Sequence, residues 1–267
     1  MPIGVGEVRI PDDEDFREFI KLAEDQEGWS QQYAKSGGTT VWTREGSSSA
    51  IKMFKVYRYF PDINAEVMYD VLHDGDYRPL WDKAMIEGKE VCLLNPNNDI
   101  GYYALKCPSP IKNRDFVLQR TWLETSTEYV IFNHSIFHKD LPPKKGYVRA
   151  ESQVTGYLIR PKPKGCEMTY VSQSDPKGSL PKWLVNKVTQ IIAPKIMQRV
   201  YKACLKYPSW KAKNNPNHKP WLYPEQNTLP RLKLDDILQR ADYSTESLDE
   251  SELQEDEFKV ADLDLED

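Results

Sequence analysis

Residues 175–207 read DPKGSLPKWLVNKVTQIIAPKIMQRVYKACLKY and predict a long helix that follows a turn. Ser179 is a suitable N-cap, because a serine hydroxyl can accept a hydrogen bond from a free amide of the first helical turn. Pro181 is tolerated within that first turn. At 1.5 Å per residue, a helix from Pro181 to Tyr207 would be about 40 Å long. A helix of this length must cover a substantial surface.

Pro194 divides this helix into two halves with different apolar faces. At 100° per residue, one face of the first half carries Leu184, Val188, Ile191 and Ile192. The apolar residues of the second half centre on another face, with Ile196, Val200, Ala203 and Cys204. Proline lacks an amide donor and clashes with the preceding turn, so we expect a kink. Two interpretations remain open: a kinked core helix, or a lid whose halves contact different surroundings with a hinge at Pro194.

The composition indicates a globular protein without a membrane-spanning or secretory segment. Of 267 residues, 39% are hydrophobic, which suffices for a buried core. The apolar runs are too short to cross a membrane, and the N-terminus lacks the pattern of a signal peptide. The four cysteines show no CxxC spacing, which is typical of a reduced, intracellular protein. We therefore expect a cytoplasmic protein.

The net charge of −5 conceals two parts of opposite sign. Residues 235–267 contain 14 acidic and two basic residues, a net charge of −12, and the rest of the chain carries +7. Because the basic residues are spread out, they suit transient contact with anionic membranes better than nucleic-acid binding. The acidic segment contains few large apolar residues, so we expect it to be disordered.

The order of the predicted elements indicates an antiparallel α+β fold with a curved sheet that grips the last helix. Helices are expected at 11–27, 64–72 and 77–81, a hairpin at 29–42, and strands at 51–60, 85–94, 101–107, 116–124, 129–137, 147–160 and 166–173. We divide the chain into an N-terminal extension (1–10), a main globular domain (11–210), a strap rich in Pro and Trp (211–234) and the acidic tail (235–267).

No catalytic motif is present, and no metal site is expected. HExxH, GxSxG, Walker and GxGxxG patterns are absent from the sequence. His134 and His138 have a spacing that suits zinc on a helix, but they lie in a predicted strand. There they would be about 13 Å apart, too far to share an ion. We expect neither an enzyme nor a cofactor.

Arg78 and Asp82 are the charged pair most relevant to binding. On a helix they are i, i+4 neighbours and can form an ion pair. Such a pair is either an ordinary surface ion pair or a buried arginine held ready for a phosphate, to which its planar fork is suited.

Aromatic residues on predicted strands are either core residues or a cage for a quaternary ammonium: Tyr102, Tyr103, Phe116, Trp122, Tyr157 and Tyr170.

Three segments resemble the START (StAR-related lipid transfer) domain family, in particular its phosphatidylcholine transfer protein-like subgroup. They are HDGDYRPLWD at 73–82, CPSPIKNRDFVLQR at 107–120 and DPKGSLPKWLVNKVTQIIAPK at 175–195. The resemblance implies a helix-grip fold, in which a curved antiparallel sheet of about nine strands and the last helix enclose a tunnel for one phospholipid. The loop from Pro108 to Arg114, with Ile111, would form a gate together with that helix.

The resemblance also implies a head-group site. Arg78 would contact the lipid phosphate and Asp82 would hold the arginine, while Tyr103, Phe116 and Gln153 occupy the positions of an aromatic choline cage. Because Gln153 replaces one aromatic wall and can hydrogen-bond a primary ammonium, we expect both phosphatidylcholine and phosphatidylethanolamine to bind.

The expected function is transfer of phospholipid between membranes by a cytosolic monomer that touches membranes transiently. The alternative is a lipid-sensing adaptor that signals its loading state to a protein partner. In the tail, Ser247 precedes Glu250 by three residues, and Ser251 lies in the same acidic stretch, which suits an acid-directed kinase such as casein kinase II. Added phosphate charge would slow transfer.

Overall fold

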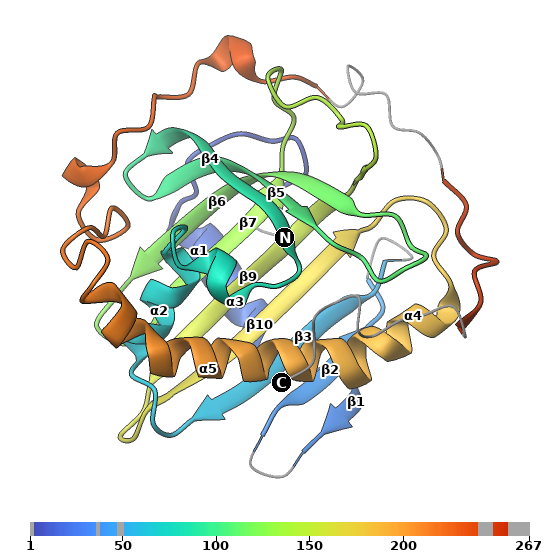
Figure 1. The fold of residues 1–267 in the computed structure, drawn as a ribbon, viewed down its shortest axis with the longest axis horizontal. Helices are drawn as coiled ribbons and strands as arrows, with labels where there is room; N and C mark the ends of the chain where they lie inside the picture. The colour runs from blue at the N-terminus through green and yellow to red at the C-terminus, as the bar shows by residue number, and fades with distance from the viewer. Residues whose placement is uncertain (1–2, 36–37, 47–50, 240–247, 256–267) are drawn as a thin grey trace.

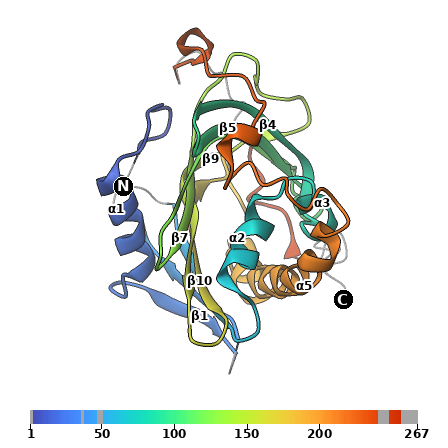
Figure 2. The same ribbon diagram turned by 90° about the vertical axis from the view of Figure 1, so that its left-hand side faces the viewer.

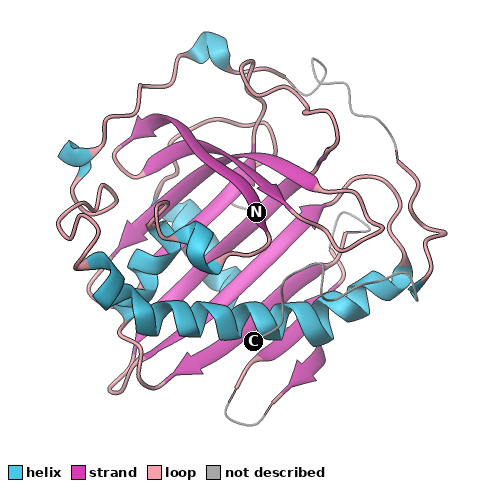
Figure 3. Ribbon diagram, viewed as in Figure 1, coloured by secondary structure: helices cyan, strands magenta, loops and turns pink. Residues whose placement is uncertain are grey.

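A ten-stranded sheet dominates the computed structural model, which describes residues 3–35, 38–46, 51–239 and 248–255 (Figures 1 and 3). Its strands are β1 (Ser30–Ala34), β2 (Thr40–Arg44), β3 (Met53–Phe60), β4 (Met85–Asn95), β5 (Asn98–Leu105), β6 (Arg114–Glu124), β7 (Tyr129–Ser135), β8 (Val148–Arg149), β9 (Glu151–Pro161) and β10 (Cys166–Asp175). Nine of them follow the order β1-β2-β3-β10-β9-β7-β6-β5-β4 with antiparallel pairing, and β8 pairs in parallel with β6. The expected antiparallel α+β fold is confirmed.

Helices cover both faces of the sheet. They are α1 (Asp13–Glu24), α2 (Ala65–His73), α3 (Arg78–Trp81), α4 (Lys182–Lys187), the π-helical η1 (Val188–Ile192), α5 (Ala193–Lys211) and two short 3₁₀ turns, η2 (Pro224–Gln226) and η3 (Leu234–Asp236). Figure 2 shows α1 on one side of the sheet, with α2, α3 and α5 on the other. Within the described ranges, no helix combines the length and apolar character that a membrane crossing requires.

Strand β7 shows why the sheet is buried on both faces. Successive side chains of a strand point to opposite sides. Val130 and Phe132 therefore pack with α1, whereas Tyr129 and Ile131 belong to the core beneath α2 and α5. The head-group candidates lie on this second side, between the sheet and the helices.

The beginning of the last helix differs from the expectation. Pro181, and not Ser179, is the residue that precedes the first helical turn, and no side chain caps it. Ser179 instead pairs through its backbone with a distant part of the chain, as described below. The helix then continues to Lys211, beyond the expected end at Tyr207, with Pro208 inside it.

A π-helical segment precedes Pro194 at the place where we expected a kink. The amide of Ala193 donates to the carbonyl of Val188, five residues back, and Pro194 opens α5. A proline tolerates the first turn of a helix because its missing amide would have no partner there. The wider π turn thus separates the proline from the helix in front of it.

The two halves of the last helix contact different surroundings. The π segment lies against β1 and β2, and α5 lies against α2, α3, β2 and β3. In α5 the buried apolar side chains are those of Met197, Val200, Ala203, Cys204 and Tyr207. Ile196, expected on this buried face, is 36% exposed and lies at its edge. The apolar residues of the first half are only partly buried: Leu184, Val188, Ile191 and Ile192.

The strap after α5 runs around the outside of the sheet (Figure 1). Lys219 and Trp221 anchor it to Asp70 of α2, through Nζ at 2.6 Å and Nε1 at 2.9 Å. The strap then pairs with the edge strand β4, where the amide of Leu93 donates to the carbonyl of Pro230 at 2.9 Å. These contacts fix residues 211–234 to the domain.

Two parts of the acidic tail, for which we expect disorder, contact the domain in the structure. Leu238 N donates to Phe137 O at 3.0 Å, and residues 248–255 lie against the turn before the last helix. These residues contact the domain through backbone hydrogen bonds and one buried carboxylate, interactions that a count of apolar side chains does not register. Ser247 lies outside the described residues.

Candidate functional site

Arg78 and Asp82 lie one turn apart at the two ends of α3. The Asp74 carboxylate forms the preceding turn by accepting from the amides of Asp76 and Tyr77, both at 3.1 Å. At the other end, the amide of Asp82 donates to the carbonyl of Arg78 at 2.9 Å. The short helix thereby brings Nε of Arg78 to 3.8 Å from Oδ2 of Asp82, as the i, i+4 spacing predicted.

Tyr103 of β5 interacts with both members of this pair. Its hydroxyl donates to Oδ2 of Asp82 at 3.0 Å, and its ring centre lies 5.9 Å from the Arg78 guanidinium. Burial and the negative charge of Asp82 raise the pKa of Tyr103 well above 10. The phenol therefore remains a neutral hydrogen-bond donor.

The guanidinium of Arg78 lies deep in the domain, yet 23% of its side-chain surface is accessible. Burial works against its charge, but Tyr157 and Asp82 outweigh this effect and raise the pKa of Arg78 above its ordinary value. The cation also lies 5.1 Å from the centre of the Trp81 ring. Arg78 is thus a permanent cation held by one carboxylate and two rings.

Two of the three cage positions are neighbours in the sheet. Tyr103 pairs with Phe116 across β5 and β6. Gln153 comes from β9, where it is the unpaired residue of a β-bulge opposite β10, and β9 contacts β6. The structure therefore brings together Arg78, Asp82, Tyr103 and Phe116, and places Gln153 on a strand beyond them.

The strand register shows which of the aromatic candidates lie near Arg78 and which do not. Tyr157 and Tyr170 pair across β9 and β10 with ring centres 5.1 Å apart, and the charge of Arg78 acts on the Tyr157 hydroxyl, partly opposing the effect of burial on its pKa. Tyr102 points to the opposite face, where its hydroxyl donates to Asp115 at 3.0 Å. Trp122 is a core residue that donates to the carbonyl of Trp221.

Arg120 is a second deep arginine, which sequence reasoning missed. It pairs across strands with Asp99, and its Nη2 donates to Asp99 and, at 2.8 Å, to Glu90. Its charge and that of Arg78 add to burial in lowering the pKa of His73 on α2. The only sequence signal was alternation along β6, which places Arg120 on the same face as Phe116.

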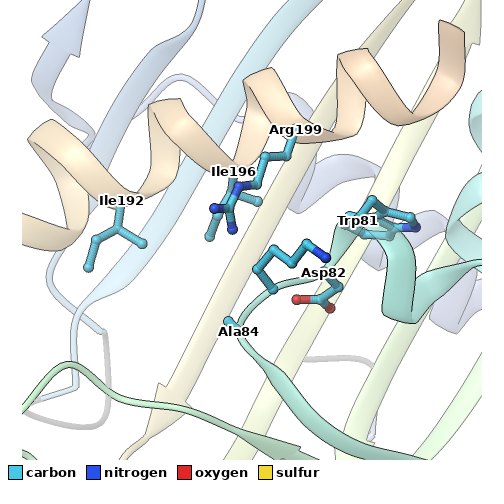
Figure 4. A pocket seen from close by; sticks show the side chains of 7 residues that line it. Trp81, Asp82, Ala84, Ile192, Ile196 and Arg199 are labelled. Carbon is cyan, nitrogen blue, oxygen red and sulfur yellow. The ribbon is translucent and has the colours of Figure 1, made fainter. Parts of the chain in front are cut away.

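A small pocket of about 30 Å³ lies between Asp82 and the last helix (Figure 4). It lies between the connection from α3 to β4 and the helix, where Asp82 and Ile192 both line it. Its remaining lining consists of Trp81, Lys83, Ala84, Ile196 and Arg199. One lid residue and the site carboxylate thus share one pocket.

The predicted gate loop is tied to the turn before the last helix. Ile111 is buried at 5% exposure. Arg114, 3% exposed, donates to the backbone carbonyls of Lys112 at 2.6 Å and Pro176 at 3.1 Å. One arginine therefore connects residues 108–114 to the segment that leads into α4.

The histidines have structural partners. His134 lies on β7 with Nε2 2.7 Å from the carbonyl of Glu7. His138 lies beyond the end of β7, and its Nδ1 accepts from the amide of Asp140. Ligand atoms of His138, Asp140 and Asp236 lie within 4.8 Å of one another, but Asp236 is already paired with Lys139. The described residues give no further reason to place a metal there.

Comparison with known proteins identifies the family. The START domain model matches residues 12–211. START domain-containing protein 10 of Mus musculus is 47% identical over 256 residues, covering 95% of this chain and 87% of the relative. Phosphatidylcholine transfer protein of Mus musculus is 27% identical over 207 residues, covering 73% and 94% of the two chains.

The fold agrees with these relationships. The crystal structure of human STARD10 superposes with a TM-score of 0.81 at 47% identity, covering 88% of this chain and 97% of that one. The second of these relatives is named as a transfer protein for phosphatidylcholine, and neither of the two names denotes an enzyme. The expected helix-grip architecture is also confirmed, since the ten-stranded antiparallel sheet is crossed by one long C-terminal helix. This chain therefore belongs to the START domain family.

Proposed function

We propose that this protein binds one phospholipid and transfers it between membranes, with Arg78 as the group that receives the lipid phosphate. The observation that carries this proposal is the state of Arg78: its guanidinium is deep in the domain, partly accessible and 3.8 Å from a single carboxylate. A guanidinium has five N–H donors. The ion pair with Asp82 leaves several of them for phosphate oxygens, to which the planar fork is matched.

Tyr103 and Phe116 would form two walls around the head group. Their rings are adjacent in the sheet, and ring faces attract cations. Gln153 would stand at the third wall, where its amide oxygen can accept from a primary ammonium. We therefore propose that phosphatidylcholine and phosphatidylethanolamine both bind.

The acyl chains would lie beneath the last helix, in the tunnel implied by the family. Removing them from water is favourable by roughly 0.8 kcal/mol per CH₂ group, so release requires contact with a bilayer. Lys202 and Lys206 are exposed on α5, and Lys195 and Arg199 are partly exposed. We propose that these cations assist transient docking of a cytosolic monomer on anionic membranes.

Phosphorylation of the tail would then oppose docking. Ser251 is exposed and lies beside Asp249 and Glu252 in a sequence that suits an acid-directed kinase such as casein kinase II. A phosphate adds up to two negative charges, which repel an anionic membrane. Ser247 is the second candidate, and transfer should be slower when either residue carries phosphate.

Native mass spectrometry of the protein purified from cells tests the cargo. We expect one phospholipid per chain, with both choline and ethanolamine head groups represented. Transfer of labelled lipid between donor and acceptor vesicles tests the activity. Protein that carries no phospholipid and moves none between vesicles would contradict the proposed function, and protein carrying phosphatidylcholine alone would contradict the relaxed head-group preference.

A further inference from the structure

The acidic segment 248–255 docks beside the turn that precedes the last helix. The amide of Ser179 donates to the carbonyl of Leu248 at 3.0 Å, and the amide of Glu250 donates back to the carbonyl of Ser179 at 2.8 Å. These bonds form a short parallel bridge between Ser179 and Asp249. Ser179 thus pairs with the tail in the position where the sequence suggested a helix cap.

Gly178 allows this close approach. Its φ of +72° lies in the left-handed region, which side chains rarely adopt. A Cβ atom at this position would lie only 2.2 Å from the carbonyl oxygen of Leu248. The turn is therefore shaped to admit the backbone of an extended segment.

Glu250 inserts its carboxylate into the gate loop. The residue is 6% exposed, Oε1 accepts from the amide of Lys112 at 2.8 Å, and Oε2 accepts from Nη2 of Arg114 at 2.7 Å. Both charged side chains are almost fully removed from water, at 3% and 7% exposure. A buried guanidinium requires a charged partner, and here the tail supplies it.

The same segment also reaches the first helical turns of the lid. The indole of Trp183 donates to the carbonyl of Leu253 at 2.9 Å, and Lys187 forms an ion pair with Glu255 at 2.8 Å. Eight residues thus connect the gate loop, the turn at 177–179 and α4. These are the elements that must separate if the gate is to open.

We propose that the gate loop, residues 177–179 and α4 form a binding site for an extended acidic peptide, that residues 248–255 occupy this site, and that their docking holds the gate closed. The effect on lipid exchange rests on the proposed function, whereas peptide binding does not. The site recognises a carboxylate through Arg114 and the amide of Lys112, and a peptide backbone through Ser179.

The docked segment can be released without unfolding the domain. In a buried ion pair the loss of hydration offsets much of the attraction, which limits the net free energy that holds the segment in place. The eight residues 240–247 tether the segment near its site and keep its local concentration high. Docking is therefore favoured by proximity and remains reversible.

The full-length variant Glu250→Gln removes the charge that pairs with Arg114 and leaves the side chain similar in shape. Glu252→Gln is the matched control, because it removes one negative charge from the same segment at an exposed position. Hydrogen–deuterium exchange should become at least tenfold faster at residues 108–114 and 179–187 in Glu250→Gln and remain unchanged in Glu252→Gln. Unchanged exchange in β7 shows that the variant is folded.

A fluorescent peptide with the sequence of residues 248–255, LDESELQE, tests the site directly. It should bind the Glu250→Gln protein at least tenfold more tightly than the wild type, whose own tail competes, and a peptide with Gln at its third position should bind weakly. Equal exchange in both variants together with no peptide binding would overturn the proposal. Faster exchange without faster vesicle-to-vesicle transfer would retain the peptide site and refute its role in holding the gate closed.

Discussion

The hydroxyl of Tyr103 donates to Oδ2 of Asp82 at 3.0 Å, and the same oxygen lies 3.8 Å from Nε of Arg78. A residue of β5 thus fixes the carboxylate that positions an arginine of α3. Because Tyr103 of β5 and Arg78 of α3 both interact with this oxygen atom, the sheet and the short helix jointly determine where the guanidinium points.

The change Tyr103→Phe removes this hydrogen bond and keeps the ring. One such bond contributes about 1 kcal/mol, so we expect roughly fivefold weaker phospholipid binding. Displacement of a fluorescent phosphatidylcholine measures the affinity. Tyr223→Phe, at a tyrosine that is 49% exposed, is the control and should bind as the wild type. Equal affinities of the two variants would show that the bond does not position Arg78.

The change Arg78→Ala removes the proposed phosphate ligand. Hydrogen bonds to charged groups contribute about 1.5–3 kcal/mol, so binding should weaken roughly 10- to 100-fold and vesicle-to-vesicle transfer should fall accordingly. Arg17→Ala, at an exposed position on α1, provides the charge-matched control. Undiminished transfer by the Arg78 variant would exclude this residue from the site.

The change Gln153→Tyr restores an aromatic residue at the third cage position. A ring over a quaternary ammonium contributes about 0.5–2 kcal/mol, so the ratio of bound phosphatidylcholine to phosphatidylethanolamine should rise roughly 2- to 30-fold. Native mass spectrometry of co-purified lipid gives this ratio. Gln190→Tyr, on the exposed side of the last helix, should leave it unaltered. If the Gln153 variant also leaves it unaltered, Gln153 does not contact the head group.

The change Asp74→Ala tests the anchor of the last helix. Oδ2 of Asp74 accepts from the hydroxyl of Tyr207 at 2.9 Å and from Nζ of Lys211 at 2.8 Å, with the lysine side chain only 9% exposed. An unpaired buried ammonium remains, so the free energy of unfolding in urea should fall by about 3–5 kcal/mol. Asp76→Ala, at an exposed position nearby, should change it by less than about 0.5 kcal/mol.

Buried His73 should make stability depend on pH. Burial, with the charges of Arg120 and Arg78, lowers its pKa well below 6.5, so the folded protein keeps the ring neutral while the unfolded chain binds a proton. The free energy of unfolding therefore keeps its full value above pH 6.5. Below that pH it falls by about 1.4 kcal/mol per pH unit. His134 contributes with the same sign, because burial also lowers its pKa.

Urea unfolding between pH 7 and 5 measures this dependence. The slope of the unfolding free energy against pH should be smaller in His73→Phe, whatever the absolute stability of that variant. The exposed His218 supplies the control variant His218→Gln, which should keep the wild-type slope. An unchanged slope in the His73 variant would mean that this ring does not contribute.

Local spacing predicted some contacts correctly and failed for others. The pair Arg78–Asp82 followed from helical geometry alone. Ser179 was misassigned as a cap, because its partner is a residue 70 positions further along the chain. Composition did not indicate that the acidic tail contacts the domain, because Glu250 pairs with Arg114, a residue 136 positions away in the chain.

By itself, the sequence determined the order of strands and helices, the α+β class, the family and the one-turn relation of Arg78 to Asp82. These follow from periodicities of 2.0 and 3.6 residues and from short motifs, which act over a few positions. Only the tertiary structure decided which aromatic rings share a face with Arg78, that the turn before Pro194 is π-helical, and where the tail docks. Strand register and the pairing of buried charges depend on residues far apart in the chain, so no local pattern contains them.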